Sequence, residues 1–431
     1  MMKESFLHFI WEFQFFDKET LQTSDGEVVD ILHQGLKNTN AGADFYNARI
    51  RTGGIEWSGS VEIHINASDW KKHRHHTDRA YNNVVLHVVW QDDCPVQRAD
   101  GTFVPTIELK NRISPKMYEQ YRQFLNAPGI IPCSVQFCQI PDIQKLAMLD
   151  RVLVERLHVK AEKVYALYEE NNNDMEEAAW QLLAMNFGSK LNAEPFLMLG
   201  KALPLKILRK HGSNLMQMEA LLFGMAGMLD GSFKDSYPNQ LKKEFEFLSQ
   251  KYGLKNKALQ GHEWKFLRIR PAGFPTVKIA SLAALIHKLS SLYTALINVE
   301  HTKEAEDLFD VEVSTYWQNH FVFDKPVDKA LSGLGRSSVE NIVINSIAPL
   351  LACTAKLRDN ELLMDKAIAL LESTGAENNR ISRLYKNLGL EVRNAFDSQA
   401  CIQLYRDYCR RKRCLECNGG IYLMKQHQLI S

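Results

Sequence analysis

Residues 42–90 limit the possible folds of this chain most strongly, because they carry the alternating pattern of paired β-strands. Polar and apolar side chains alternate over residues 44–51 and again over residues 55–65, which predicts two strands. The Thr-Gly-Gly sequence at 52–54 between them is typical of a hairpin turn. Residues 84–90 are nearly all apolar, which predicts a central strand covered on both faces.

The flanking segments have other patterns. Residues 5–16 are aromatic on almost every side and predict a buried helix, whereas residues 20–43 are rich in turn-forming residues and predict a loop. Residues 103–109 predict a further strand, and Pro105 favours an edge position for it. From residue 141 to residue 400, segments of 3.6-residue periodicity are separated by Gly, Pro and Asn, which predicts about ten helices.

A chain of 431 residues is too long for one ordinary core, so we expect two or three domains. The patterns predict an α+β protein in three parts. Residues 1–140 form a mixed-sheet α/β domain, residues 141–400 form a large all-α domain, and residues 401–431 form a basic tail that contains cysteines.

The composition excludes several classes of protein. Hydrophobic residues make up 45% and charged residues 24% of the chain, as in soluble globular proteins. The net charge of +1 gives no overall attraction to nucleic acid or to a membrane. The longest apolar run, residues 220–229, is too short to span a bilayer, and the N-terminus lacks the features of a signal peptide. With eight cysteines and no export signal, we expect reduced thiols and a cytoplasmic location.

An acidic pair with a nearby imidazole is the first candidate site. Asp44 opens the first strand of the predicted hairpin, and Glu62 and His64 share one face of the second strand, about 7 Å apart. Carboxylates on neighbouring strands can meet across a sheet and hold Mg²⁺ or Mn²⁺. His64 could then orient or activate the attacking water. A polar outer face of the hairpin, without catalytic function, is the alternative.

This arrangement resembles the PD-(D/E)XK nuclease-like core, in which an Asp precedes one strand and Glu-x-Lys lies on the next. Asp44 follows Ala43 where that core has Pro-Asp, and Glu62-Ile63-His64 occupies the place of Glu-x-Lys. A short helix at 78–81 and the strand at 84–90 follow in the order of that core. The resemblance implies metal-dependent phosphodiester hydrolysis, with the Ile63 carbonyl assisting both carboxylates. His64 in place of Lys is the departure from the motif.

The whole chain also resembles an uncharacterised bacterial family of the Bacteroidetes type, known only as a domain of unknown function. That resemblance implies no activity. The resembling stretches are residues 5–16, 38–45, 62–64, 70–87, 270–279 and 414–417.

A group of histidines forms the second candidate site. Histidine and aspartate at short spacing suit Zn²⁺, and a zinc hydrolase is therefore one alternative function. The other alternative is that some of these side chains line the rim of the carboxylate site and contact the substrate. The zinc candidates are His73, His75, His76, Asp78 and His87, and the candidate substrate contacts on the sheet domain are His33, His73, His76, Asp78 and Tyr81.

Cysteines in the tail form the third candidate site. Cys409, Cys414 and Cys417 have the spacing of a compact metal-chelating loop, followed by a Gly-Gly pair that permits a tight turn. Zinc is the first expectation, with Cys401 or His427 as the fourth ligand. Some nucleases that the core resembles carry three C-terminal cysteines and a distant one, which implies an iron–sulfur cluster with Cys133 or Cys138 as the alternative. Free thiols are the remaining possibility.

Two basic segments could contact nucleic acid. One is the run of five cations between Arg406 and Arg413 in the tail. The other contains Arg268 and Arg270, together with Lys265 and Lys278, among aromatic residues that can stack on bases. A solvated helix face and a packing loop are the structural alternatives. Three functions follow: a metal-dependent nuclease, a non-catalytic scaffold that binds nucleic acid or protein, and a zinc hydrolase.

Overall fold

The computed structural model describes residues 2–328 and 334–427. These residues divide into two compact units, one with residues up to 148 and from 404 onward, the other with residues 149–403. The predicted α+β class is confirmed, with a mixed sheet near the N-terminus and helices after it. The sequence predicts a separate tail from residue 401, whereas the structure groups the chain from Leu404 with the N-terminal residues.

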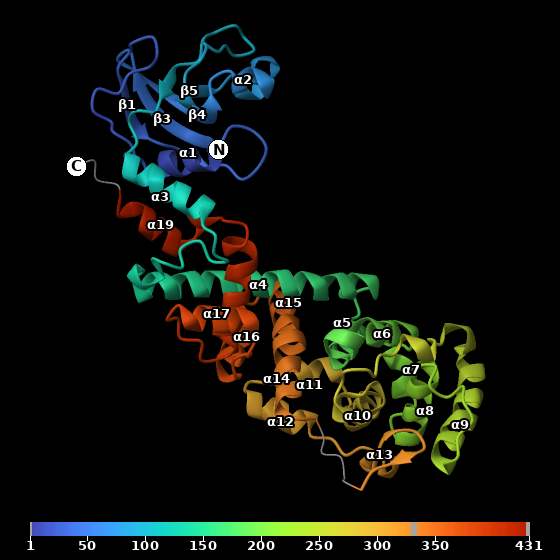
Figure 1. Cartoon of the computed structure of the whole chain (residues 1–431). Helices are drawn as coiled ribbons and strands as arrows, with labels where there is room; N and C mark the ends of the chain where they lie inside the picture. The colour runs from blue at the N-terminus through green and yellow to red at the C-terminus, as the bar shows by residue number, and fades with distance from the viewer. Residues whose placement is uncertain (1, 329–333, 428–431) are drawn as a thin grey trace. The chain divides into compact units, whose positions relative to one another are not determined.

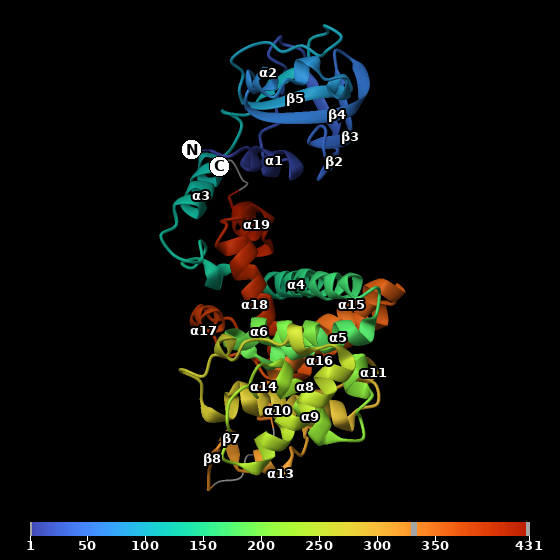
Figure 2. The ribbon, with the colours of Figure 1, turned by 90° about the vertical axis from the view of Figure 1, so that its right-hand side faces the viewer.

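The first unit is built on a mixed sheet (Figure 1). Its order is β1-β3-β4-β5-β6, with β2 paired to β3; the pairs from β1 to β4 are antiparallel and those from β4 to β6 are parallel. Two helices, α1 and α2, both contact β4, and they lie on opposite sides of the sheet (Figure 2). The elements are α1 (Glu4–Glu12), β1 (Val29–His33), β2 (Leu36–Lys37), β3 (Phe45–Thr52), β4 (Ile55–Asn66), α2 (Asp69–Lys72), η1 (His75–Thr77), η2 (Arg79–Tyr81), β5 (Val84–Gln91), β6 (Thr106–Glu108), α3 (Pro115–Asn126) and η3 (Phe137–Gln139).

The predicted hairpin is confirmed as β3 and β4. Thr52 pairs with Ile55, and the two glycines between them have φ values of 57° and 79°. Two successive residues with positive φ form the turn that matches the twist of a two-residue hairpin, which glycine adopts without strain. The predicted central strand is also confirmed, because residues 84–89 of β5 are all buried.

The structure differs from the sequence-based expectation around this hairpin. Residues 20–43, expected to be a loop, contain the edge strands β1 and β2, whose mostly exposed side chains give no apolar alternation. Ile55 and Trp57, on the apolar face of the alternating pattern, are exposed because the tip of the hairpin extends beyond the core. The C-terminal half of β4 is buried on both faces instead.

Two local features fix the strands next to Asp44. The pairing of β3 with β4 is interrupted by a bulge between Phe45 and Ala48, where Asn47 has a positive φ of 57°. A bulge bends a strand and changes the direction of its side chains, often beside a functional site. Gly59 allows β4 to approach β5, because a Cβ atom there would lie 2.3 Å from the Asn83 carbonyl oxygen.

The second unit is almost wholly helical. Polar caps begin several of its helices: Asp174 accepts hydrogen bonds from two backbone N–H groups of α5, and Asn379 does the same for α17. The elements are α4 (Asp142–Glu170), which begins in the first unit, then α5 (Met175–Phe187), α6 (Ser189–Ala202), α7 (Leu205–Arg209), α8 (Leu215–Met225), α9 (Ser236–Tyr252), η4 (Lys255–Lys257), η5 (Gly261–Glu263), η6 (Pro271–Gly273), α10 (Pro275–Lys288), α11 (Leu292–Asn298), α12 (Thr302–Phe309), α13 (Thr315–Gln318), β7 (His320–Val322), β8 (Lys325–Pro326), α14 (Arg336–Ile342), η7 (Val343–Ile347), α15 (Ala348–Arg358), α16 (Glu361–Ser373), α17 (Arg380–Asn387) and α18 (Ala395–Gln403).

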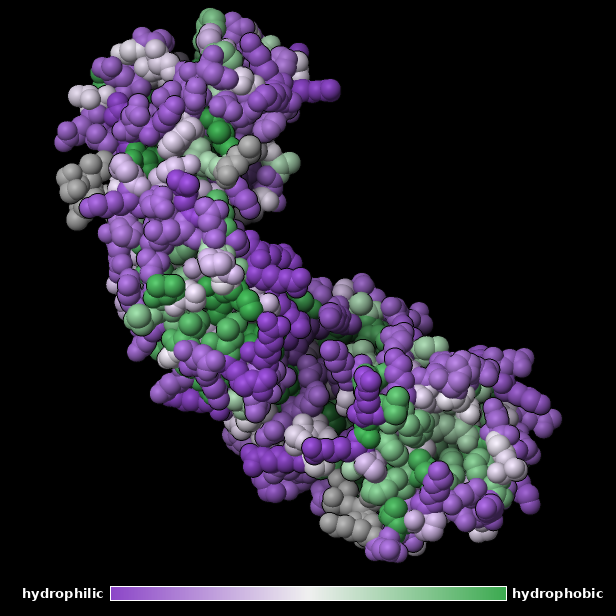
Figure 3. Space-filling view, viewed as in Figure 1, coloured by the Kyte–Doolittle hydropathy of each residue, from purple (hydrophilic) through white to green (hydrophobic). Residues whose placement is uncertain are grey.

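One continuous helical stretch, Arg336–Arg358, is long and apolar enough to cross a membrane, but 78% of its apolar window is buried inside the protein. α10 and α11 together pass the same test with a 91° bend between them. Burial of this degree is typical of a core helix. The visible surface of the helical unit is mainly hydrophilic, with hydrophobic residues gathered in one area (Figure 3).

The C-terminal segment belongs to the first unit and contains η8 (Leu404–Cys409), η9 (Cys414–Glu416) and α19 (Asn418–Lys425). α19 contacts α3, and η9 contacts α1. A Cβ atom on Gly420 would overlap the Cys414 carbonyl oxygen at 2.0 Å, so the Gly-Gly pair permits the tight turn that the sequence predicts. The sequence at 414–420 therefore folds back closely on itself.

Candidate metal site

The two predicted carboxylates lie side by side and are joined through the backbone. Asp44 immediately precedes β3, and its backbone N–H donates to Glu62 Oε2 at 3.1 Å. In return, Asp44 Oδ2 accepts a hydrogen bond from the Ile63 N–H at 2.9 Å. The side chain of Asp44 is 25% exposed, whereas that of Glu62 is 7% exposed. The pair therefore has one buried member and one that solvent reaches.

Helix α1 adds two polar residues to this pair that the sequence did not single out. His8 Nε2 lies 3.3 Å from Asp44 Oδ2. Burial raises the pKa of Glu4 to about 7; His8 opposes the increase, and the charges of Asp44 and Glu62 add to it. The only signal in the sequence is the spacing of four residues between Glu4 and His8, which places both on one face of an aromatic helix.

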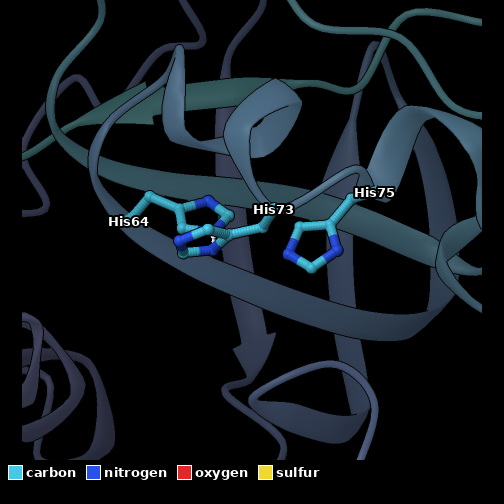
Figure 4. A group of neighbouring side chains, drawn as sticks. All are labelled: His64, His73 and His75. Carbon is cyan, nitrogen blue, oxygen red and sulfur yellow. Dashed lines mark hydrogen bonds between the residues drawn. The ribbon is translucent and has the colours of Figure 1, made fainter.

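Three histidines gather over the same strand. His64 projects from β4, His73 follows α2, and His75 begins η1 (Figure 4). Each offers a ring nitrogen, and these nitrogens all lie within 4.8 Å of one another. His64 Nε2 is 3.0 Å from His73 Nδ1, and His64 Nδ1 is 2.8 Å from Nε2 of His87 on β5.

Glu62 connects the carboxylate pair to the histidines. Its Oε1 atom lies 3.1 Å from His75 Nε2 and 3.6 Å from His64 Nε2. The contact with His75 lacks hydrogen-bond geometry, so this buried nitrogen has no hydrogen-bond partner in the part of the chain that the structure describes. Burial raises the pKa of Glu62, while His75 opposes the increase.

Burial disfavours the charged form of the imidazoles deepest in the cluster. Burial, followed by the neighbouring His87, His73 and His75, lowers the pKa of His64 to about 2. Burial, followed by the charge of His75, lowers the pKa of His87 to about 3. A neutral imidazole has one lone pair that can bind a metal ion. Because His64 is only 1% exposed, it has little access to the water molecule that the sequence-based role assigns to it.

Aromatic residues enclose the histidines. Trp70 is fully buried, and its ring lies edge-on to that of His64 with centroids 6.5 Å apart. The Tyr81 ring stacks on the His75 ring with centroids 3.8 Å apart. Burial raises the pKa of Tyr81 to about 12, with a contribution from the negative charge of Glu62. Trp70 and Tyr81 hold the histidine rings in place and exclude water from one side of them.

Other predicted contacts lie outside this group. His33 is exposed on β1, and its Nδ1 accepts a hydrogen bond from the Gly35 N–H. His76 is exposed in η1, and the Asp78 carboxylate caps η2 by accepting from the Ala80 N–H. Within residues 2–328 and 334–427, the metal-type group consists of His64, His73 and His75, without His76 or Asp78.

The basic residues are divided between the units. Arg268 and Arg270 are exposed in the helical unit, which is separate from the unit that contains Asp44. In the tail, internal contacts occupy much of the predicted basic run. Arg411 pairs with Asp407, and Arg413 pairs with Glu416. Lys412 donates to a backbone carbonyl near the end of α3.

The cysteines of the tail have one neighbouring cysteine, Cys133, from the N-terminal part of the same unit. Cys409 and Cys414 are buried, and Cys417 is partly buried. Burial raises the pKa of Cys414, and the neighbouring thiols of Cys133, Cys409 and Cys417 raise it further. Among the described residues, however, only the histidine group brings three potential ligand atoms within 4.8 Å of one another.

The cysteines predicted as possible fourth ligands of the tail site lie in different parts of the chain. Cys401 lies in α18 of the helical unit, and burial raises the pKa of its thiol to about 12. Cys138 is exposed. Burial also raises the pKa of Cys133 to about 12, with a contribution from Cys417. Cys133 is therefore the distant cysteine that the structure brings to the tail.

A family model described as a protein of unknown function, DUF2851, matches residues 4–380. The chain belongs to the DUF2851 family. The predicted membership of a family of unknown function is thus confirmed. No curated protein and no solved structure matches this DUF2851 chain. The matched range includes Asp44, Glu62 and the histidine group, and it ends before Cys409.

Proposed function

We propose that the first unit of this DUF2851 protein is a metal-dependent phosphodiester hydrolase with a PD-(D/E)XK-like core. The observation that carries the proposal is the reciprocal bonding of Asp44 and Glu62, whose carboxylates each accept from the backbone of the other's segment. Two carboxylates fixed in this way, with one open to solvent, form a hard oxygen-ligand set for Mg²⁺ or Mn²⁺.

The order of elements supports the same proposal. Helix α1 is followed by the antiparallel strands β1, β3 and β4, by short helical segments, and by β5 parallel to β4. This is the order of helix, three strands, helix and strand that the resemblance implies. Asp44 immediately precedes β3 and Glu62 lies on β4, as in the nuclease-like motif.

The residues fit a divalent ion through their oxygen donors. Asp44 and Glu62 would hold the ion, with the Ile63 carbonyl as a further donor. When bound, such an ion polarises a phosphodiester and lowers the pKa of a coordinated water. His8 Nε2 lies beside this carboxylate, 3.3 Å from Asp44 Oδ2. The Asp44 N–H fixes one oxygen of Glu62, and the other oxygen lies beside the histidines.

Cleavage of nucleic acid with matched variants tests this function. The full chain is incubated with linear duplex DNA, single-stranded DNA and RNA in Mg²⁺ or Mn²⁺. Asp44→Ala and Glu62→Ala should each reduce cleavage at least about 100-fold, because metal-assisted charge stabilisation is worth several kcal/mol. Glu56→Gln is the control. Glu56 lies on the same strand as Glu62, but it is exposed and forms an ion pair with Arg49.

The proposal fails if Asp44→Ala cleaves as fast as the wild type. It also fails if the wild-type chain cleaves none of these substrates in any divalent metal. Binding without cleavage would favour the non-catalytic scaffold as the function of this protein.

We also propose a structural metal at Cys409, Cys414 and Cys417, with Cys133 as the fourth ligand and zinc preferred over an iron–sulfur cluster. The proposal is supported by the spacing of the three cysteines, by the tight turn at Gly420, and by the approach of the four thiols within one unit. Four thiolates form a closed structural zinc site. Such a site would connect the C-terminal segment to residues 115–148.

A further inference from the structure

We propose that His64, His73 and His75 form a second metal site, for a zinc-class ion, with Glu62 Oε1 on its fourth side. Three imidazoles and one carboxylate oxygen suit zinc and similar transition metals rather than Mg²⁺. The three ring nitrogens lie within 4.8 Å of one another, on residues from β4, the end of α2 and η1 (Figure 4).

Three of the separations between the ligand atoms are close to those of a tetrahedral site. With zinc–nitrogen bonds of about 2.0–2.1 Å, neighbouring ligands of a tetrahedron lie about 3.3 Å apart. His64 Nε2 lies 3.0 Å from His73 Nδ1 and 3.6 Å from Glu62 Oε1, and His75 Nε2 lies 3.1 Å from the same Glu62 oxygen. These three distances lie on both sides of the tetrahedral value.

One buried ring nitrogen lacks a hydrogen-bond partner, which supports a bound metal ion. His75 is 8% exposed, and its Nε2 atom has no hydrogen-bond partner among the described residues although it faces Glu62. A buried polar atom without a partner costs about 1–3 kcal/mol. A metal ion between His75 and Glu62 would bind this nitrogen and remove the penalty.

Neighbouring residues provide the outer shell that a histidine site needs. Metal-binding histidines usually donate their second ring nitrogen to a fixed acceptor, which sets the tautomer and the direction of the ring. His64 Nδ1 lies 2.8 Å from His87 Nε2, so His64 Nε2, which faces His73 Nδ1, is the nitrogen that would bind the ion. Trp70 and Tyr81 surround the rings and limit their rotation.

This site is distinct from the proposed hydrolytic pair. Glu62 alone belongs to both, and its two oxygens face different neighbours: Oε2 accepts from the Asp44 N–H, and Oε1 faces the histidines. Metal binding can be measured without turnover. The inference therefore stands or falls independently of the hydrolase proposal.

Loading of the metal-free full chain with Co²⁺ and Zn²⁺ tests the site. After chelator treatment, Co²⁺ titration should give weak visible bands typical of nitrogen and oxygen ligands, and zinc X-ray absorption should detect imidazole scatterers. Any metal at the cysteines is recognised separately by sulfur-to-cobalt charge-transfer bands and by sulfur scattering. The variants are His73→Ala and the matched control His76→Ala, since both histidines are exposed and lie three residues apart.

His73→Ala should weaken zinc binding at this site by more than about tenfold, because loss of an outer-shell partner alone costs about that much. His76→Ala should bind as the wild type does. Equal binding by both variants, loss of binding in both, or a wild-type chain without nitrogen-ligated Co²⁺ would overturn the proposal. Asp44→Ala should retain this zinc even if hydrolysis is lost, which separates failure of this site from failure of the hydrolase.

Discussion

The rings of Tyr81 and His75 stack with their centroids 3.8 Å apart and their planes inclined by 27°. This contact joins the short η2 segment to the histidine group. The stack helps to hold the His75 ring beside Glu62, whose Oε1 lies 3.1 Å from His75 Nε2.

Replacing Tyr81 by Ala should therefore lower the stability of the first unit and disorder the metal site. Aromatic pairs contribute about 0.5–1.5 kcal/mol beyond area burial, so we expect a loss of about 1–3 kcal/mol in the free energy of unfolding. Denaturant unfolding followed by tryptophan fluorescence measures the change, and zinc titration measures the site. Tyr81→Phe, which keeps the stacked ring, should resemble the wild type; an equal loss in both variants would assign the effect to the hydroxyl group.

Removal of metal from the cysteine site should release the C-terminal segment. If Cys409, Cys414 and Cys417 share an ion with Cys133, Cys414→Ser should remove sulfur-ligated metal from the purified protein, because the loss of one thiolate opens a closed site. Hydrogen exchange of residues 404–425 should then increase, while the sheet keeps its protection.

Cys138→Ser is the matched control for that experiment, since Cys138 is exposed and five residues from Cys133. Its metal content and exchange pattern should equal those of the wild type. Purified wild-type protein that contains neither zinc nor iron on sulfur, even after reloading under reducing conditions, would leave these cysteines as free thiols.

The sequence predicts the parts of the site that depend on local geometry. The Gly-Gly turn and the alternation on either side set the pairing of β3 with β4, and that pairing brings Asp44 to Glu62 across only 18 residues. Strands β1 and β2 could not be predicted from the sequence, because exposed edge strands need no alternation of apolar and polar residues.

The histidine group depends on longer-range folding. His73 and His75 reach His64 only because residues 67–77 turn back over β4, and no periodic signal in the sequence reports that path. Glu4 and His8 likewise come near Asp44 only through the packing of α1 on the sheet. The residue types predict a metal site, but the tertiary packing determines which of these residues lie next to one another.

In the helical unit, Glu219 should make stability depend on pH. This fully buried carboxylate accepts hydrogen bonds from Tyr237, Ser314 and Trp317, yet burial raises its pKa from 4.5 to about 7. Below pH 4.5 the group is protonated in both states. Between pH 4.5 and 7 the unfolded chain releases its proton while the folded chain keeps it, so stability falls as the pH rises, and the full penalty is present above pH 7.

Glu219→Gln should remove that dependence, because the amide has the same shape and carries no charge at any pH. The penalty that it removes above pH 7 is on the order of 3 kcal/mol. Calorimetric unfolding of both proteins between pH 4.5 and pH 8 should therefore show the variant gaining stability relative to the wild type as the pH increases. Glu312→Gln, at an exposed position, should keep the wild-type slope. Parallel stability curves for wild type and Glu219→Gln would mean that the folded chain keeps Glu219 ionised over this whole range, with its three donors compensating for burial.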